Sequence, residues 1–144
     1  MFDKQVYLLR RSVLKSKFGS GVLLFLGNEE SPMNYKDNTY HFRQDSTFLY
    51  YFGISEPSLA AIIDLDEGRE IIFGNEMSID DIVWMGRQKT LKEKSEDSGL
   101  MEQLPYSELE VYLKKCKANN RNVQFLPPYR AENQIKISTW FNLS

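Results

Sequence analysis

The stretch "YHFRQDSTFLYYFGISEP", residues 40–57, decides the fold because it joins a polar pair to a compact apolar helix. Seven of its first thirteen residues are aromatic or histidine. Ser46 is predicted to cap a helix that begins at Thr47, and Gly53 is predicted to end it in the left-handed conformation. The segment between them, "TFLYYF", is apolar on every side, so we expect a short helix that is buried all round.

Arg43 and Gln44 form the polar pair at the head of this stretch. An arginine beside buried aromatic side chains usually has polar partners, because a guanidinium is not buried unpaired. We therefore predict that the pair is structural and holds the loop that leads into the helix. Contact with a substrate is the alternative for Arg43.

Bulk composition favours one globular domain and excludes several classes of protein. The chain has 144 residues, of which 42% are hydrophobic and 26% charged, as in ordinary soluble domains. A net charge of −2 argues against a nucleic-acid partner. The single cysteine, Cys116, excludes an internal disulfide, and its apolar helical spacing predicts a buried, inert thiol. No segment is apolar for the roughly 20 residues of a membrane span, and the N-terminus is too charged for a signal peptide. We expect a cytoplasmic protein without a membrane partner.

Hydrophobic spacing predicts helices and strands along the rest of the chain. A first helix is expected at 3–17, with an apolar stripe of Phe2, Val6, Leu9 and Val13. The other predicted elements are a strand at 22–26, a surface loop at 27–38, a hairpin of 59–65 and 69–74 around 66–68, short helices at 78–86 and 90–99, a helix opening with a capping box at 107–110, a strand at 122–126 and a final helix at 131–142. Helices and strands alternate without strict regularity, which favours an α/β fold with a mixed sheet.

The chemistry-bearing residues do not predict an active site. His41 is the only histidine, so a zinc site or a Ser-His-Asp triad has at most one imidazole. The motifs HExxH, GxSxG, GxGxxG and the P-loop are absent. The pairs Asp64–Asp66 and Asp80–Asp81 fit a hairpin turn and the first turn of a helix. We expect no catalytic residue and no metal ligand in this chain.

Trp84 and Arg87 remain as candidates for contacts with another molecule. Trp84 lies at the end of the predicted 78–86 helix, where a large ring either fills the core or projects as an anchor. The residues alone leave both readings open. Arg87 is a candidate cation at the rim of a site, and a surface ion pair is its simpler role.

The stretch at 40–57, together with "DIVWMGR" at 81–87, resembles the N-terminal domain of Xaa-Pro aminopeptidase (aminopeptidase P) in the creatinase/prolidase N-terminal-domain family. That family's pattern is an aromatic residue, then Arg-Gln-x-Ser-x-Phe-x-Tyr-x-x-Gly-x-x-Glu-Pro, and later Trp-x-Gly-Arg. The matching residues are Tyr40, Arg43, Gln44, Ser46, Phe48, Tyr50, Gly53, Glu56 and Pro57, then Trp84, Gly86 and Arg87. Prolidase, which cleaves Xaa-Pro dipeptides, shares much of this pattern.

The resemblance implies a mixed sheet flanked by helices, similar to the ribonuclease H-like fold. It implies that residues 1–144 form one non-catalytic domain of a longer metallopeptidase. In the family, a following "pita-bread" domain holds two metal ions, usually Mn²⁺, through two aspartates, a histidine and two glutamates. None of these ligands has a counterpart here, so we expect no cofactor on this chain and no peptidase activity from it alone.

The resemblance also implies what such a domain contributes. It walls one side of the active-site cleft and supports homo-oligomers, and a tryptophan at the position of Trp84 reaches the substrate pocket of a neighbouring subunit. The expected partners are its own C-terminal catalytic domain, further copies, and peptides with proline as the second residue. Tyr40, Arg43, Gln44, Ser46, Gly53, Gly86 and Arg87 are then the structural part of the motif. The alternatives are the same domain of an Xaa-Pro dipeptidase, or a non-enzymatic peptide- or histone-binding module of the same fold.

Overall fold

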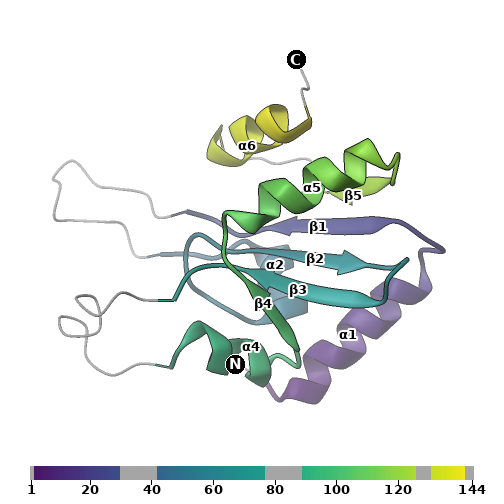
Figure 1. Ribbon diagram of the computed structural model, residues 1–144. Coiled ribbons are helices and arrows are strands. Elements are labelled where there is room, and N and C mark those ends of the chain that lie inside the picture. The colour runs from purple at the N-terminus through teal and green to yellow at the C-terminus, as the bar shows by residue number, and fades with distance from the viewer. Residues whose placement is uncertain (1, 30–41, 77–88, 126–130, 142–144) are drawn as a thin grey trace, which may run out of the picture.

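A five-stranded sheet lies between two layers of helices (Figure 1). The computed structural model describes residues 2–29, 42–76, 89–125 and 131–141. The elements in chain order are α1 (Lys4–Ser16), β1 (Val22–Leu26), α2 (Ser46–Phe52), β2 (Ala60–Asp64), β3 (Arg69–Phe73), α4 (Leu91–Asp97), β4 (Glu102–Leu104), α5 (Glu108–Ala118), β5 (Val123–Phe125) and α6 (Ala131–Phe141). The predicted α/β fold with a mixed sheet is confirmed.

The strand order is β4-β3-β2-β1-β5. The directions of the strands make the two ends of the sheet different. β1, β2 and β3 form an antiparallel meander, while β4 and β5 add in parallel to β3 and β1. Consequently β1, β3, β4 and β5 all finish at one end, which we call the carboxyl end of the sheet. The β2–β3 turn lies at the opposite end, which we call the hairpin end.

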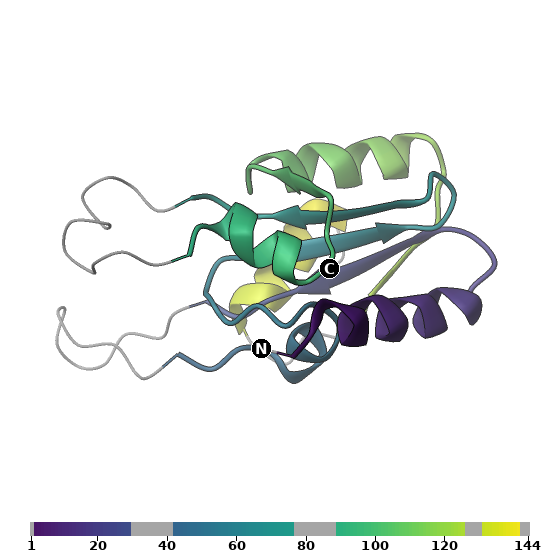
Figure 2. The same ribbon diagram turned by 90° about the horizontal axis from the view of Figure 1, so that it is seen from below.

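Each face of the sheet buries its own apolar cluster. α5 and α6 cover the face formed by Val22, Leu24, Ala60, Ile62, Ile71 and Phe73. α1, α2 and α4 lie on the other face, with Leu23, Ala61, Ile63 and Ile72 (Figure 2). Side chains alternate between faces along a strand, so a strand covered on both sides must be apolar throughout. The near-continuous apolar runs of β1 and β2 follow from this requirement.

The predicted apolar stripe of α1 is wrong, because the helix packs through a different face. Leu9 and Val13 are 65% and 49% exposed, whereas Tyr7 and Arg11 are buried. The Arg11 side chain is fully buried and donates from Nε to Glu70 at 2.9 Å and from Nη2 to the carbonyl of Ser98 at 2.7 Å. A cation with this many partners can be buried, which apolar spacing alone does not reveal.

The short helix α2 forms as expected but with a different cap. Asp45, not Ser46, is the N-cap, and its carboxylate accepts from the Phe48 N–H at 2.9 Å. Ser46 is the first helical residue, so the predicted cap is wrong by one position. Gly53 does end the helix, with φ of 68°. A Cβ at this position would also collide with the Tyr7 ring, so both backbone and packing require glycine.

Three further differences concern the polar parts of the chain. Leu49 and Tyr50 of α2 are exposed, so that helix is not buried all round. Ser107 has helical dihedrals and makes no capping bond, whereas Thr90 and Glu93 form a capping box at the start of α4. The short strand β4 was not predicted. The expected helix at 78–86 lies outside the described residues.

No helix among the described residues combines the length and the apolar character that spanning a lipid bilayer requires.

Candidate functional site at the carboxyl end of the sheet

The side-chain amide of Gln44 organises the carboxyl end of the sheet. Its Oε1 accepts from the N–H groups of Asn28 at 2.8 Å and Asp45 at 3.1 Å. Its Nε2 donates to the carbonyls of Ile54 at 3.1 Å and Glu56 at 2.9 Å. A buried amide with two bonds at each terminal atom is fully satisfied and fixes the backbone around it. Gln44 therefore joins the segment after β1, the start of α2 and the turn that leads to β2.

Gly27 makes room for this amide. A Cβ at Gly27 would lie 2.9 Å from the Leu59 carbonyl oxygen and 3.0 Å from Gln44 Oε1. The next residue, Asn28, donates from Nδ2 to the carbonyl of Arg43 at 3.1 Å. Only a glycine allows the amide to pack directly against the end of β1. The predicted role of Gln44 in holding the loop before α2 agrees with this geometry.

Glu29 continues the polar cluster toward α6. Its carboxylate accepts from the Lys136 ammonium and from the Ser58 hydroxyl. Lys136 also donates to the Tyr106 hydroxyl at 2.8 Å. Burial raises the pKa of Tyr106, so this phenol stays protonated at neutral pH. These contacts tie the last described helix to the residue that precedes segment 30–41.

The described residues on either side of segment 77–88 are also held by polar contacts. Glu76 accepts from the backbone N–H groups of Leu91 at 2.6 Å and Lys92 at 3.2 Å, at the N-terminus of α4. A carboxylate at a helix N-terminus is stabilised by the free N–H groups there. Lys89 forms an ion pair with Asp97 at 2.7 Å. The chain thus leaves and re-enters the same end of the sheet at fixed points.

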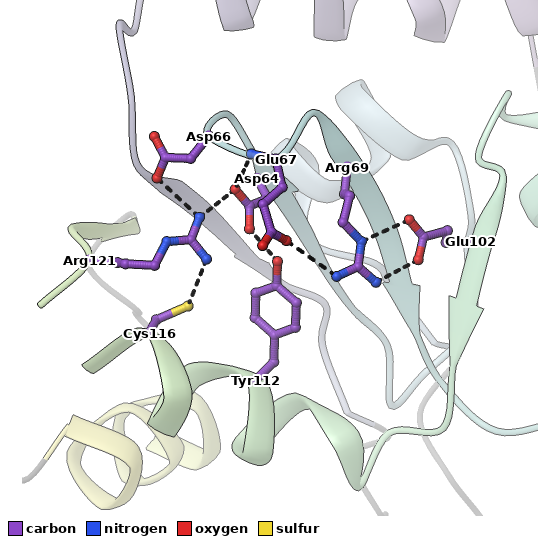
Figure 3. Close-up of polar contacts among 8 residues, drawn as sticks. All are labelled: Asp64, Asp66, Glu67, Arg69, Glu102, Tyr112, Cys116 and Arg121. Carbon is purple, nitrogen blue, oxygen red and sulfur yellow. Dashed lines mark hydrogen bonds and ion pairs between the residues drawn. The ribbon is translucent and has the colours of Figure 1, made fainter. Parts of the chain in front are cut away.

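The hairpin end carries a different kind of polar cluster (Figure 3). The buried carboxylate of Asp64 accepts from the Arg121 guanidinium, the Tyr112 hydroxyl and the N–H of Glu67. Burial by itself raises the pKa of Asp64, but the bonds from Arg121 and Tyr112 outweigh it and lower the pKa below its ordinary value. Asp66 also binds Arg121, at 3.0 Å. This cluster closes on itself and fixes the loop after α5 to the β2–β3 turn.

A second ion pair lies beside this cluster, on the outer side of β3. Arg69 binds Glu102 with two bonds, of 3.0 and 2.7 Å, and its bonds lower the pKa of that carboxyl (Figure 3). Cys116 is buried, as predicted, and burial raises the pKa of its thiol. A raised thiol pKa means little thiolate at neutral pH, which agrees with an inert side chain.

The described residues do not fit a metal centre. They contain no group of three or more histidine, cysteine, aspartate or glutamate side chains placed to hold a metal ion. Asp64 and Asp66 both direct carboxylate oxygens at one guanidinium, that of Arg121. A cation and a metal ion do not share the same carboxylate oxygens without repulsion.

The structure brings together some of the predicted motif residues. Gln44 is buried at the centre of the carboxyl end, and Gly53 closes α2. The Arg43 side chain is exposed and makes no ion pair within the described ranges, so the expected buried cation is not Arg43. The buried arginine is Arg11, on another element. Trp84, Tyr40, Gly86 and Arg87 lie outside the described residues.

Sequence reasoning missed several residues of this end, above all Glu29, Tyr106 and Lys136. Each is an ordinary surface type in the sequence, and they meet only because α6 packs beside the end of β1. The signal that existed was Gly27, a glycine directly after an apolar strand, which often marks close approach of another group.

Several curated proteins are similar to this chain in sequence over part of its length. Among curated proteins, the human Xaa-Pro dipeptidase is 32% identical over 66 residues, which are 46% of this chain and 13% of that protein. The Xaa-Pro dipeptidase of Pongo abelii is 29% identical over 87 residues, 60% of this chain and 17% of that protein. The chain therefore spans less than a fifth of the length of these curated relatives.

Solved structures share the fold over nearly the whole chain. An aminopeptidase P of Escherichia coli superimposes with a TM-score of 0.79 and 21% identity, covering 98% of this chain and 33% of that one. The proline aminopeptidase P II of Yersinia pestis gives a TM-score of 0.80 and 20% identity, with the same coverage of each chain. The chain spans about a third of these structures. Finally, the pattern of the family described as "Aminopeptidase P, N-terminal domain" matches residues 7–125. The chain belongs to the aminopeptidase P N-terminal domain family.

Proposed function

We propose that this chain is the non-catalytic N-terminal domain of a cytoplasmic Xaa-Pro metallopeptidase. Family membership over residues 7–125 is the observation that carries the proposal. The similar solved structures are aminopeptidases about three times as long, which leaves room for a separate catalytic domain. Two Mn²⁺ ions belong to that domain in this proposal, and the reaction is release of the residue that precedes proline.

The role proposed for the domain is to wall the active-site cleft and to support a homo-oligomer. The carboxyl end of the sheet suits such a wall, because Gln44, Glu29 and Glu76 hold the backbone on either side of two segments. Binding elements work best when a rigid scaffold presents them. Trp84 belongs to the second of these segments, and we assign it to a neighbouring subunit's substrate pocket, where an indole packs well against a proline ring.

A dipeptidase is the second candidate, because the curated relatives are Xaa-Pro dipeptidases. The two enzymes differ in the substrate length that they accept. A longer form of this protein, supplied with Mn²⁺, is assayed on Xaa-Pro dipeptides and on longer peptides with proline second. Turnover of the longer peptides supports the aminopeptidase, and turnover of dipeptides alone supports the dipeptidase. If the enzyme turns over neither kind of substrate, the proposal is overturned.

Two controls sharpen this assay. Residues 1–144 alone are expected to hydrolyse neither substrate, since the described residues offer no metal centre. Trp84→Ala is expected to raise KM or lower kcat in the longer enzyme, and to leave the free energy of unfolding of this chain within about 0.5 kcal/mol, as surface changes usually do. Loss of stability by several kcal/mol in this chain would place Trp84 in the core instead.

A further inference from the structure

Polar contacts at the carboxyl end of the sheet join into a closed ring. On one side of the ring, Lys136 binds both the Glu29 carboxylate and the Tyr106 hydroxyl. The N–H of Tyr106 in turn donates to Asn75 Oδ1 at 3.2 Å. The residue after Asn75 is Glu76, whose carboxylate holds the N-terminus of α4. This side of the ring therefore connects the residue after β1 with the start of α4.

The other side of the ring runs through α4 itself. The Lys94 ammonium binds the Glu56 carboxylate at 2.6 Å, and the carbonyl of Glu56 accepts from Gln44 Nε2 at 2.9 Å. Gln44 Oε1 accepts from the N–H of Asn28, which is the neighbour of Glu29. The ring therefore includes described residues on both sides of each of the two segments that leave this end of the sheet.

α4 depends on such polar contacts for its position. It has seven residues, of which Leu91 and Ser95 are buried. A helix this short is not stable by itself and relies on its contacts with the rest of the fold. Glu76 binds the N–H groups at its start, and Lys94 binds Glu56 from its middle. These two contacts fix the helix to the end of β3 and to the turn before β2.

We propose that Lys94 is a positioning residue for peptide binding by the longer enzyme. Through Glu56 it fixes α4, and through the start of α4 it supports the contact with Glu76, after which segment 77–88 begins. Trp84 belongs to that segment, and its contact with the substrate is proposed above, so the inference rests on the proposed function. Displacing a binding group slightly, even from far away, is enough to weaken its contact with a substrate.

The partial exposure of this ion pair separates a positioning role from a purely stabilising one. The side chains of Lys94 and Glu56 are 26% and 22% exposed. Ion pairs that water still reaches contribute little to the free energy of unfolding. A change at Lys94 should therefore leave the domain folded while it releases α4 from the turn before β2. An effect on substrate binding is then not a consequence of unfolding.

The first test measures steady-state kinetics of the longer enzyme, supplied with Mn²⁺, on a peptide with proline as its second residue. Lys94→Met removes the charge and keeps an unbranched side chain. It is expected to raise KM at least about threefold and to leave kcat unchanged, the pattern of a lost binding contact. Loss of folded enzyme would instead lower the apparent kcat at an unchanged KM. Lys94→Arg keeps the ion pair and is expected to retain the wild-type KM.

Two further variants make this test specific. Lys92→Met is the matched control, because Lys92 lies on the same helix with an exposed side chain that forms no ion pair within the described ranges, and its KM should not change. Lys94→Met is also combined with Trp84→Ala. If Lys94 acts through Trp84, the double variant has the KM of Trp84→Ala alone. Increases in KM that multiply overturn the inference, as does a wild-type KM in Lys94→Met.

A second test needs no activity and separates this inference from the proposed function. Amide hydrogen exchange in the 144-residue chain reports how often the N–H of Leu91 leaves Glu76, to which it donates at 2.6 Å. Lys94→Met is expected to speed this exchange at least about threefold, and Lys92→Met to leave it unchanged. Unchanged exchange in Lys94→Met overturns the inference even if the longer enzyme is an active peptidase. If exchange responds as expected but the longer enzyme cleaves no Xaa-Pro peptide, the proposed function fails, and the assignment of Lys94 to peptide binding fails with it.

Discussion

The two ends of the sheet are held together by different kinds of polar contact, one charged and one neutral. At the hairpin end, Asp64 and Arg121 are held by charge. At the carboxyl end, the neutral amide of Gln44 makes four bonds to backbone groups. A charged pair is strong but depends on protonation, whereas an amide has the same hydrogen-bonding pattern at every pH. The comparison teaches that the end expected to face a cleft is held without a titrating group at its centre.

The largest effect is expected from removing the buried charge at the hairpin end. Asp64→Ala leaves the Tyr112 hydroxyl without the Asp64 carboxylate as acceptor, and it leaves Asp66 as the one described carboxylate bound to Arg121. Breaking a buried ion pair costs about 3–5 kcal/mol, and we expect a loss of that size in the free energy of unfolding from urea titrations. Asp66→Ala is the control, because its carboxylate is 39% exposed and exposed ion pairs contribute little, so its loss is expected to be much smaller than that of Asp64→Ala. Equal losses in the two variants would contradict the assignment.

The same end should weaken in acid. The pKa of Asp64 is lowered in the folded protein, so its contribution is complete above the unfolded value of about 3.9 and is lost as the pH falls through the lower folded value. The free energy of unfolding of the wild type is therefore expected to decline below about pH 4. Asp64→Asn should show a shallower decline over the same titration. Parallel curves would mean that other carboxylates dominate.

A carboxylate introduced at the carboxyl end of the sheet should reverse the direction in which stability changes with pH. Gln44→Glu replaces the Nε2 donors by an oxygen that faces the carbonyls of Ile54 and Glu56. We expect a loss of about 3 kcal/mol at neutral pH, from a buried carboxylate without donors at that side. Burial raises the pKa of the introduced acid, so stability should recover as the pH falls toward 5. Gln44→Met, which has no titrating group, serves as the control and should show no such recovery.

A smaller effect is expected from the cap of α2. Asp45→Ala removes the bond to the Phe48 N–H and should cost about 1 kcal/mol in thermal or urea unfolding. Ser46→Ala should cost clearly less, since Ser46 is already helical and is not the cap. The reverse order of the two losses would restore Ser46 as the capping residue.

The smallest effect is expected at Arg43. Its side chain is exposed, and only its carbonyl takes part in the described contacts. Arg43→Ala should therefore change the free energy of unfolding by no more than about 0.5 kcal/mol. A loss of 1 kcal/mol or more would show that Arg43 supports the carboxyl end through its side chain. With stability unchanged, lower turnover in the longer enzyme would point to contact with the substrate.

The elements that could be predicted are those that residues close together in the sequence indicate by themselves. The runs of β1 and β2 are apolar because both faces are covered, and the turn at 66–68 joins β2 to β3 within a few residues. Helix ends were less certain, since Asp45 and Ser46 are both good caps and only the backbone distinguishes them. The three-residue strand β4 has no periodicity of its own and exists because β3 offers it an edge.

The polar clusters could not be predicted, for a physical reason. Arg11 meets Glu70 and Ser98, and Asp64 meets Arg121, across long stretches of intervening chain. Each residue type is usually on the surface, and its burial depends on partners that only the completed fold supplies. The position of Gln44 beside apolar residues predicts a structural role, but its four backbone partners lie on other segments that only the fold brings together.

The pairing of β5 with β1 also bears on the order of folding. The β2–β3 hairpin closes a short turn, whereas β1 and β5 are about a hundred residues apart, and such non-local contacts form slowly. We expect the meander of β1, β2 and β3 to collapse first, with β5 adding only after β4 and α5 are in place. Until then β1 is itself an open edge of the sheet. The slowest step in folding this chain is thus also the step during which it is most exposed to aggregation.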